Sequence, residues 1–307
     1  MIAIKDLKKS YNSHEALKGI SFNIKEGEFY GLLGPNGAGK TTTISIMSSI
    51  LTPDSGEVLI NGNNIYTHPN ESKRIIGVVP QEIALYNELT AEENLWFWGG
   101  LYDVPKTELK KRIDEVLTLF GLSERRKDKV STYSGGMKRR INIAAALLHQ
   151  PRIVFMDEPT VGIDPQSRNL IFEVIEKLHS NGMTIVYTTH YMEEAERFCD
   201  RIGIIDNGQI IAEGTLDELR KSSSAKETIV ITFNNLNDDK VQKIQSYWKD
   251  CSHTDDKIYF YTSDLKTELS KIISQCSDAG ADIHNIEIKK VNLETVFLSL
   301  TGKQLRD

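Results

Sequence analysis

Cysteine is scarce in this chain of 307 residues, which has only Cys199, Cys251 and Cys276. The three are odd in number, stand far apart and form no C-x-x-C pair. A disulfide framework and a zinc site are therefore both disfavoured. We expect reduced, buried thiols in a cytosolic protein.

Long apolar runs are also missing. The best candidate, Ile141 to Met156, is interrupted by the polar and proline residues 149–152, so no transmembrane helix is predicted. Lys5, Lys8 and Lys9 stand where the apolar core of a signal peptide would lie. Secretion is therefore not expected.

Positive charge is in short supply, with 37 Lys and Arg against 43 Asp and Glu and a net charge of −6. This balance argues against a broad nucleic-acid surface, and we expect no nucleic-acid partner. The hydrophobic share of 39% and the charged share of 26% are typical of a soluble globular protein with a sizeable core. At about 100–200 residues per domain, the length predicts two domains.

Residues 1–220 alternate short apolar runs with helical stretches, which predicts an α/β architecture. Thr90 to Glu93 form a capping box, and Asp164-Pro165 place an N-cap before a first-turn proline. The stretch from about residue 85 to 150 has mostly helical patterning and is predicted to be a helical subdomain. The predicted strands, rich in Ile and Val, are Glu57–Ile60, Ile75–Val79, Ile153–Met156 and Thr184–Thr188.

The last third of the chain has a different pattern. Residues 221–227 are polar and serine-rich, and we interpret them as a linker. Residues 228–307 are predicted to form a small α+β accessory domain. Its predicted strands are Thr228–Phe233, Lys257–Thr262 and Ile283–Val291, with helical runs between and after them.

A phosphate-binding loop is the strongest signal in the sequence. Gly34 to Thr41 read GPNGAGKT, which fits G-x-x-x-x-G-K-[ST]. Glycines let successive backbone N–H groups point at phosphate oxygens, and the following helix adds its positive end. Lys40 is suited to the β- and γ-phosphates and the Thr41 hydroxyl to Mg²⁺. A strand-like run at 29–33 and a helix-like run at 41–50 disfavour the alternative, a chance glycine-rich turn.

Two acids follow a buried strand. Asp157 and Glu158 end the run Ile153–Met156, where ligands bind at the carboxyl edge of an α/β sheet. Asp157 is suited to the Mg²⁺ shell, and Glu158 to orienting and deprotonating a water molecule. The alternative, two acids that merely open the turn at Pro159, is weakened by the accompanying phosphate loop.

Taken together, residues 1 to about 220 resemble the ATP-binding subunit of an ATP-binding-cassette (ABC) transporter. Tyr133–Met137 resemble the family signature, usually L-S-G-G-Q, with Met137 in place of the glutamine. Gln81 resembles the Q-loop glutamine, residues 161–164 the D-loop and His190 the switch histidine. Further stretches resemble the branch of drug-, lipid- and polysaccharide-type exporters, including daunorubicin-resistance proteins: SGGMKRR (134–140), VGIDPQSR (161–168) and NLETVFLSLTG (292–302).

The resemblance implies a P-loop NTPase core with a helical subdomain, binding ATP and Mg²⁺. It implies Glu158 as the base, Lys40 and His190 on the γ-phosphate, and Gln81 as a further catalytic residue. Thr41, Gln81 and Asp157 are implied around Mg²⁺. The implied ATP contacts are Tyr11, which stacks on adenine, Gly34, Pro35, Asn36, Gly37, Ala38, Gly39, Lys40, Thr41, Thr42, Ser134, Gly135, Gly136 and Asp164.

The resemblance also implies partners. In this family ATP lies between the phosphate loop of one subunit and the signature of another, and this chain has one copy of each. We therefore expect a second ATP-binding subunit, either an identical chain or a close paralogue, and a separate integral-membrane permease. The implied location is peripheral, on the cytoplasmic face of the cell membrane. Residues 82–86 are our candidate for the docking segment.

Other interpretations stay open for single residues. Ser134–Gly136 could be a plain helix N-cap, His190 a structural histidine, Gln81 a loop residue and Tyr11 a packing residue. At the level of function, the alternatives are a soluble ABC ATPase without a permease, acting in cofactor assembly or on ribosomes or DNA, and a regulatory module that binds ATP without hydrolysing it. The single cassette and the absence of a coiled-coil insertion disfavour the first, and the intact Glu158 and His190 disfavour the second.

Overall fold

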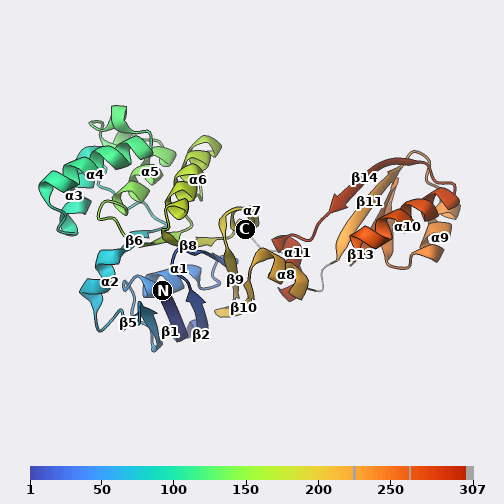
Figure 1. Ribbon diagram of the computed structural model, residues 1–307, viewed down its shortest axis with the longest axis horizontal. Coiled ribbons are helices and arrows are strands. Elements are labelled where there is room, and N and C mark those ends of the chain that lie inside the picture. Colours follow the sequence, from blue (N-terminus) through green and yellow to red (C-terminus); the bar gives the residue numbers. More distant parts are fainter. Residues whose placement is uncertain (224–225, 263, 302–307) are drawn as a thin grey trace. The chain divides into compact units, whose positions relative to one another are not determined.

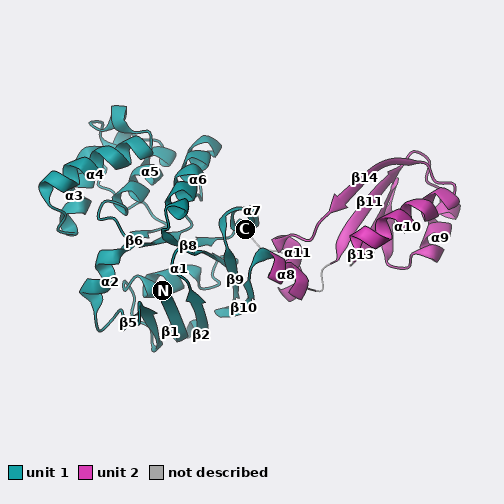
Figure 2. Ribbon diagram, in the orientation of Figure 1, with its two compact units in different colours: residues 1–216, 305–307 teal, residues 217–304 magenta. Residues whose placement is uncertain are grey.

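The computed structural model of the protein describes residues 1–223, 226–262 and 264–301. The chain divides into two compact units, unit 1 from Met1 to Leu216 and unit 2 from Asp217 onward, coloured separately in Figure 2. Helix α8 (Leu216–Ser222) extends into the first two residues of the segment predicted as a linker, and its Leu219 is buried. That prediction therefore began the linker too early; its residues 224 and 225 lie outside the described part, as do residues 263 and 302–307 of the predicted accessory domain.

Unit 1 is built on a six-stranded sheet in the order β10-β9-β3-β8-β7-β6. Every neighbouring pair is parallel except β10 and β9, which run antiparallel. The predicted strands near 76, 153 and 184 are all in this sheet. The strands are β3 (Phe29–Leu33), β6 (Ile76–Val79), β7 (Ile153–Asp157), β8 (Thr184–Thr189), β9 (Arg201–Asp206) and β10 (Gln209–Gly214).

The central strands of this sheet are buried on both faces, which explains their continuous apolar runs. Phe155 and Val186 join one hydrophobic cluster, whereas Val154 and Tyr187 join the other. Successive side chains of a strand point to opposite faces, so one strand serves two cores. The carboxyl ends of the parallel strands stay free to carry polar side chains.

A second sheet, antiparallel and ordered β2-β1-β4-β5, covers one of these cores. Its strands are β1 (Ile2–Tyr11), β2 (His14–Ile24), β4 (Ser55–Ile60) and β5 (Asn63–Asn64). No strand bounds were predicted before residue 29, and residues 57–60 were predicted to belong to the alternating α/β pattern. Lysines and register shifts interrupt β1, so its alternation of apolar residues is irregular.

Helices make up the other layer of unit 1. Figure 1 shows α3, α4 and α5 gathered in one group, away from strands β1 and β2. They pack with α6 and the sheet around the second core. The predicted capping box at Thr90 and the N-cap at Asp164 are both present. The helices are α1 (Lys40–Met47), α2 (Pro69–Ile75), α3 (Ala91–Leu101), α4 (Lys106–Leu119), α5 (Gly135–Ala145), α6 (Pro165–Ser180) and α7 (Met192–Phe198), with short 3₁₀ turns at Ser123–Arg125 and Val130–Thr132.

Unit 2 has an antiparallel sheet in the order β12-β13-β11-β14, with α9 and α10 packed on one face. The three strands predicted here are present, and β12 is a fourth that the sequence analysis missed. The elements are β11 (Glu227–Phe233), α9 (Asp238–Tyr247), β12 (Cys251–Thr254), β13 (Lys257–Thr262), α10 (Leu265–Asp278), β14 (Ile283–Lys289) and α11 (Leu293–Thr301). Within the residues described, no helix is long and apolar enough to cross a membrane.

Candidate active site

A glycine-dependent loop joins β3 to α1. Gly39, the N-cap of α1, has φ +111°, a conformation that favours glycine. A Cβ on Gly34 would lie 2.2 Å from the carbonyl oxygen of Ile205. Both positions thus require glycine for backbone reasons, and the loop brings the start of α1 to the carboxyl edge of the sheet.

Lys40 opens α1 and is buried, with 4% of its surface exposed. Its Nζ donates hydrogen bonds to the carbonyl oxygens of Gly34 (2.8 Å) and Pro35 (3.1 Å). The same Nζ lies 3.0 Å from Oε1 of Glu158. The loop therefore holds this ammonium group in a fixed place beside a buried carboxylate.

Glu158 is the point where the predicted catalytic residues meet. Its Oε1 lies 3.3 Å from Nδ1 of His190, and its Oε2 accepts a hydrogen bond of 3.3 Å from Nε2 of Gln81. With the Lys40 contact, three elements converge on this carboxylate. Its own backbone N–H donates to the Thr188 hydroxyl at 3.0 Å. Glu158, His190, Lys40 and Gln81 therefore form one contiguous group.

His190 owes its place to a buried hydroxyl network. The Thr189 hydroxyl accepts from the backbone N–H of Tyr191 and donates to Oε2 of Glu194, both at 2.9 Å. Glu194 is buried, and its Oε1 also accepts from the Thr160 hydroxyl at 2.7 Å. One carboxylate on α7 thus ties the loop after β7 to the loop after β8.

Asp157 ends β7 and is 3% exposed. Its Oδ1 accepts a hydrogen bond of 2.6 Å from the Thr188 hydroxyl, and the Thr41 hydroxyl is a second hydrogen-bond partner. Burial raises the pKa of Asp157 above its ordinary range, although both hydroxyls counteract the shift. Asp157 and Thr41 therefore present neighbouring oxygen atoms at the end of the sheet.

A cleft of about 470 Å³ opens above this group. Ten of the predicted site residues line it: Tyr11, Asn36, Gly37, Gly39, Lys40, Thr41, Thr42, Gln81, Glu158 and His190. Val161, the first residue of the predicted D-loop, also lines it. So do His14 and Ala16, which were not predicted. His14 is the register partner of Tyr11 in the β1–β2 hairpin. Recognising that hairpin would have indicated His14.

Ser134 of the signature and Asp164 of the D-loop lie outside the cleft lining. Ser134 caps α5, accepting from the Met137 N–H at 3.2 Å, and Asp164 caps α6, accepting from the Ser167 N–H at 2.9 Å. Both side chains are exposed, and neither lines the cleft. Gly136 packs so closely that a Cβ there would lie 2.1 Å from Oγ of Ser167. The chain therefore presents a signature surface separate from its own cleft.

The remaining predicted contacts fall outside the cleft lining. Gly34 and Pro35 lie behind it and hold Lys40 through their carbonyl groups, and Ala38 is buried in the core beneath the loop. Gly135 is exposed beside Ser134. Gly34, Pro35 and Ala38 thus support the phosphate loop, whereas Gly135 belongs to the signature surface.

The sequence was compared with known protein families and proteins. Residues 17–161 match the family described as ABC transporter, and residues 214–301 match the C-terminal domain of the ATP-binding proteins DrrA1-3. The chain is 46% identical to the linearmycin resistance ATP-binding protein LnrL of Bacillus subtilis over the full length of both. It is 34% identical to the Nod factor export ATP-binding protein I of Ralstonia nicotianae, over 100% of this chain and 95% of that protein.

The chain belongs to the ABC transporter family. A solved dimeric structure of the bacterial ABC transporter cassette MJ0796 superimposes with a TM-score of 0.65 and 32% identity, covering 70% of this chain and 98% of that cassette. The same cassette has also been solved as a dimer bound to ADP and Pi, with a TM-score of 0.65 and 31% identity, covering 70% of this chain and 98% of that one.

The predictions of family and fold class are thereby confirmed. The ABC transporter match, residues 17–161, lies within the first unit, and the second unit carries nearly all of the DrrA1-3-like match, residues 214–301. This ABC protein binds ATP and is an ATPase subunit of a transporter.

Two adjacent glycines of the signature should respond differently to alanine. In Gly136→Ala the new methyl group collides with Ser167, and we expect a loss of about 1–3 kcal/mol in the free energy of unfolding. In Gly135→Ala no atom lies within 4 Å of the new methyl group, and a helical alanine stabilises by up to about 1 kcal/mol. Denaturant unfolding of both variants checks this. Equal losses would contradict the packing described here.

Asp157 should lower the stability of the fold at neutral pH. Between the ordinary aspartate pKa of about 3.9 and its raised value, the folded chain binds more protons than the unfolded chain. The contribution of Asp157 to the free energy of unfolding is largest below this pH window. It is lost as the pH rises through the raised pKa. We expect Asp157→Asn to have a higher melting temperature than the wild type at pH 7, with a gap that narrows toward pH 4. Calorimetry at several pH values measures the difference in melting temperature between the two proteins. A difference that widens on acidification would contradict the raised pKa of Asp157.

Proposed function

We propose that this chain powers an export-type ABC transporter for drug-like compounds, acting at the cytoplasmic face of the cell membrane on a separate integral-membrane permease. The convergence of Lys40, His190 and Gln81 on the buried Glu158 carboxylate carries the catalytic part of this proposal. The names of the relatives support the substrate class, since they describe resistance to linearmycin and daunorubicin and export of Nod factor. Lipids or polysaccharide are the alternative substrate classes that the sequence resemblance implies.

The residues divide the work of hydrolysis among them. Glu158 accepts a proton from the attacking water, which Gln81 orients from the side of Oε2. Lys40 and backbone N–H groups of the loop 36–41 bind the phosphates, and His190 donates to the γ-phosphate. Tyr11 stands at the edge of the cleft, half exposed, where an adenine ring can stack on it.

The residues present also fit a magnesium ion. The Thr41 hydroxyl and the Asp157 carboxylate are neighbouring hard oxygen ligands, the kind that Mg²⁺ takes beside substrate phosphates. Gln81, in the same cleft, completes the proposed set with its amide oxygen. When bound, the ion neutralises charge that develops on the phosphates.

Two chains are needed to complete each site in this proposal. The cleft and the exposed residues Ser134, Gly135 and Asp164 lie on different surfaces of one chain, so an ATP in the cleft meets a signature only from a second ATP-binding subunit. The helix N-terminus at Ser134 offers free N–H groups for a phosphate. An identical chain suffices, because one chain carries both halves; a close paralogue fits equally.

The base is tested by Glu158→Gln. The amide cannot accept the proton, so we expect ATP binding to persist while hydrolysis falls by about 10²-fold or more and an ATP-dependent dimer accumulates. Glu193→Gln, the same change at an exposed carboxylate on α7, is the control and should hydrolyse normally. Phosphate release and sedimentation velocity measure the two effects. Normal turnover by the Glu158→Gln variant would sink this assignment.

A groove beside the Q-loop is the proposed docking place for the permease. It has a volume of about 620 Å³, and its lining includes Ala84 from the predicted docking segment 82–86. Ile50 and Leu101 also line it, with exposed fractions of 70% and 60%. Large apolar side chains so exposed are typical of a surface that a partner covers.

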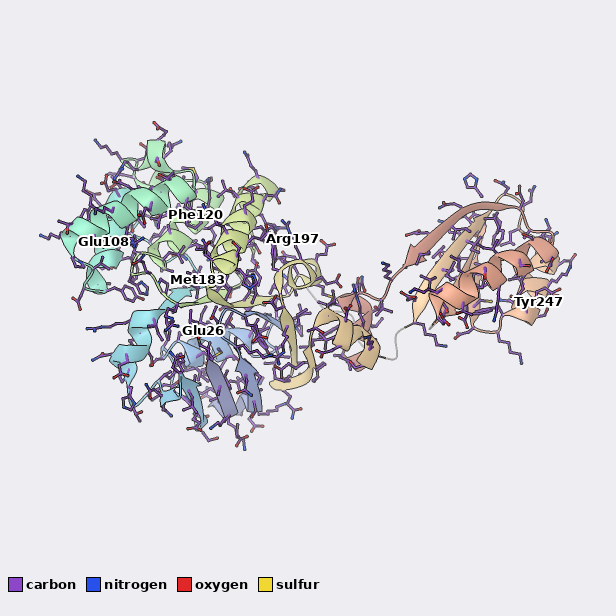
Figure 3. All side chains as sticks on the ribbon, viewed as in Figure 1. Glu26, Glu108, Phe120, Met183, Arg197 and Tyr247 are labelled. Atoms are coloured by element: carbon purple, nitrogen blue, oxygen red, sulfur yellow. The ribbon has the colours of Figure 1, made fainter. Side chains whose placement is uncertain are left out.

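Within the docking segment, Tyr86 is the residue to change. It is half exposed, whereas Leu85 packs against the helical core and would report on folding. We expect Tyr86→Asp to abolish transport while basal ATPase activity stays within twofold of the wild type. Tyr247→Asp is the control for an exposed tyrosine in unit 2, labelled in Figure 3. Transport is measured in vesicles and ATPase activity in the same preparations. If Tyr86→Asp loses both transport and basal ATPase activity, the docking role is contradicted.

The transporter role as a whole is tested by affinity capture from detergent-solubilised membranes, followed by mass spectrometry. A polytopic membrane protein that accompanies the wild type, and is lost with Tyr86→Asp, would support the proposal. Soluble partners alone, with ATPase activity intact, would favour an ABC ATPase without a permease.

A further inference from the structure

Two rings at the tip of the β1–β2 hairpin have no partner among the described residues. Tyr11 ends β1 and His14 begins β2, with Asn12 and Ser13 between them. Both side chains are exposed, that of Tyr11 to 47%. In the described part of the chain, neither ring takes part in a hydrogen bond, an ion pair or a ring contact. Contacts within the chain therefore do not account for either ring.

The hairpin places these two side chains next to each other on the cleft. Tyr11 and His14 are directly opposite in the register of the two strands. Opposite residues project from the same face of a sheet, with Cβ atoms about 5 Å apart. Both line the cleft, and so does Ala16, which lies on the same face two residues further along β2. The turn fits this arrangement, because Asn12 has φ +54°, a left-handed conformation that asparagine tolerates in two-residue turns.

Strand β2 also packs closely against the phosphate loop. A Cβ on Gly39 would lie 2.9 Å from the carbonyl oxygen of Ala16, so the two backbones meet at this point. His14 is two residues, or about 7 Å, further along the strand from that contact. A nucleotide whose phosphates bind the loop therefore extends its sugar and base along β2, past Ala16 and toward the tip of the hairpin.

The two rings differ in what they can recognise. An aromatic ring stacks on any base, since every base has a π-face, so Tyr11 contributes little selectivity. The neutral imidazole of His14 has one N–H donor and one nitrogen acceptor. A ribose hydroxyl is likewise both a donor and an acceptor. Apart from Tyr11, the other polar lining residues come from the phosphate loop and α1 or surround Glu158. His14 is therefore the hydrogen-bonding group beside the sugar.

We propose that His14 is a specificity-determining residue of the nucleotide site, which hydrogen-bonds a ribose hydroxyl while the base stacks on Tyr11. The tip of the hairpin then binds the whole nucleoside, one ring contacting the face of the base and the other the sugar. The chain accordingly prefers ribonucleotides to deoxyribonucleotides. The inference rests on the proposed stacking of adenine on Tyr11, and it adds the residue that recognises the sugar.

The test compares the binding of ADP, 2′-deoxy-ADP and 3′-deoxy-ADP to the full-length chain by titration calorimetry, which requires no hydrolysis. We expect the wild type to bind ADP about fivefold more tightly than at least one of the deoxynucleotides, the effect of one neutral hydrogen bond. His14→Phe keeps a ring but loses the hydrogen bond. In this variant ADP should bind about fivefold more weakly and the preference should disappear.

Two further variants make the result specific. His14→Gln retains a donor and an acceptor and should keep a preference of at least about twofold. His68→Phe, the same change at an exposed histidine outside the cleft lining, is the matched control and should leave all three affinities within twofold of the wild type. A wild type without a preference, or a preference that survives in His14→Phe, would overturn the proposal.

Tyr11→Ala separates this inference from the proposed function. The variant should bind all three nucleotides more weakly and by the same factor, because stacking does not involve the sugar. Unchanged binding would contradict the adenine stacking, whereas the comparison of ADP with the deoxynucleotides would still decide the role of His14. Likewise, a wild type without ATPase activity would contradict the proposed function and leave the binding test intact.

Discussion

The buried carboxylate of Glu158 is the interaction on which the rest of the site depends. Lys40, His190 and Gln81 reach it from the ends of β3, β8 and β6, while Glu158 itself follows β7. Four parallel strands thus each contribute one group. A parallel sheet makes this convergence possible because its strands all end at the same edge. A parallel sheet is stable only when both of its faces are covered. The helices cover one face and the antiparallel sheet covers the other, so both layers support the placement of these four groups.

Two acids side by side in a buried place would repel each other, and the structure shows how the repulsion is reduced. Lys40 offsets the charge of Glu158, and the hydroxyls of Thr41 and Thr188 donate to Asp157. The offset is incomplete, since burial still raises the pKa of Asp157. A buried carboxylate with a raised pKa lowers the stability of the protein at neutral pH. The proposed magnesium ion and the phosphates would offset this cost by binding the folded state.

The phosphate loop could be predicted from sequence because its geometry admits few residue types. Gly34 and Gly39 cannot carry a side chain, and Lys40 follows at a fixed step along the chain. Asp157 and Glu158 were visible for a similar reason, as the polar end of a wholly apolar strand. In contrast, β1 was missed because lysines and bulges disturb its alternation, and His14 with it. Arg139 looks like a solvent-exposed residue in a basic run; only the fold shows that it is buried against Pro80.

The cleft and the signature are separate, so sequence motifs alone do not show how the residues of a complete site come together. Ser134 and Lys40 belong to one chain, yet the chain keeps them on different surfaces, and a complete site needs a second subunit. The sequence motifs name the residues of both surfaces, whereas only the fold shows that these surfaces do not meet within one chain.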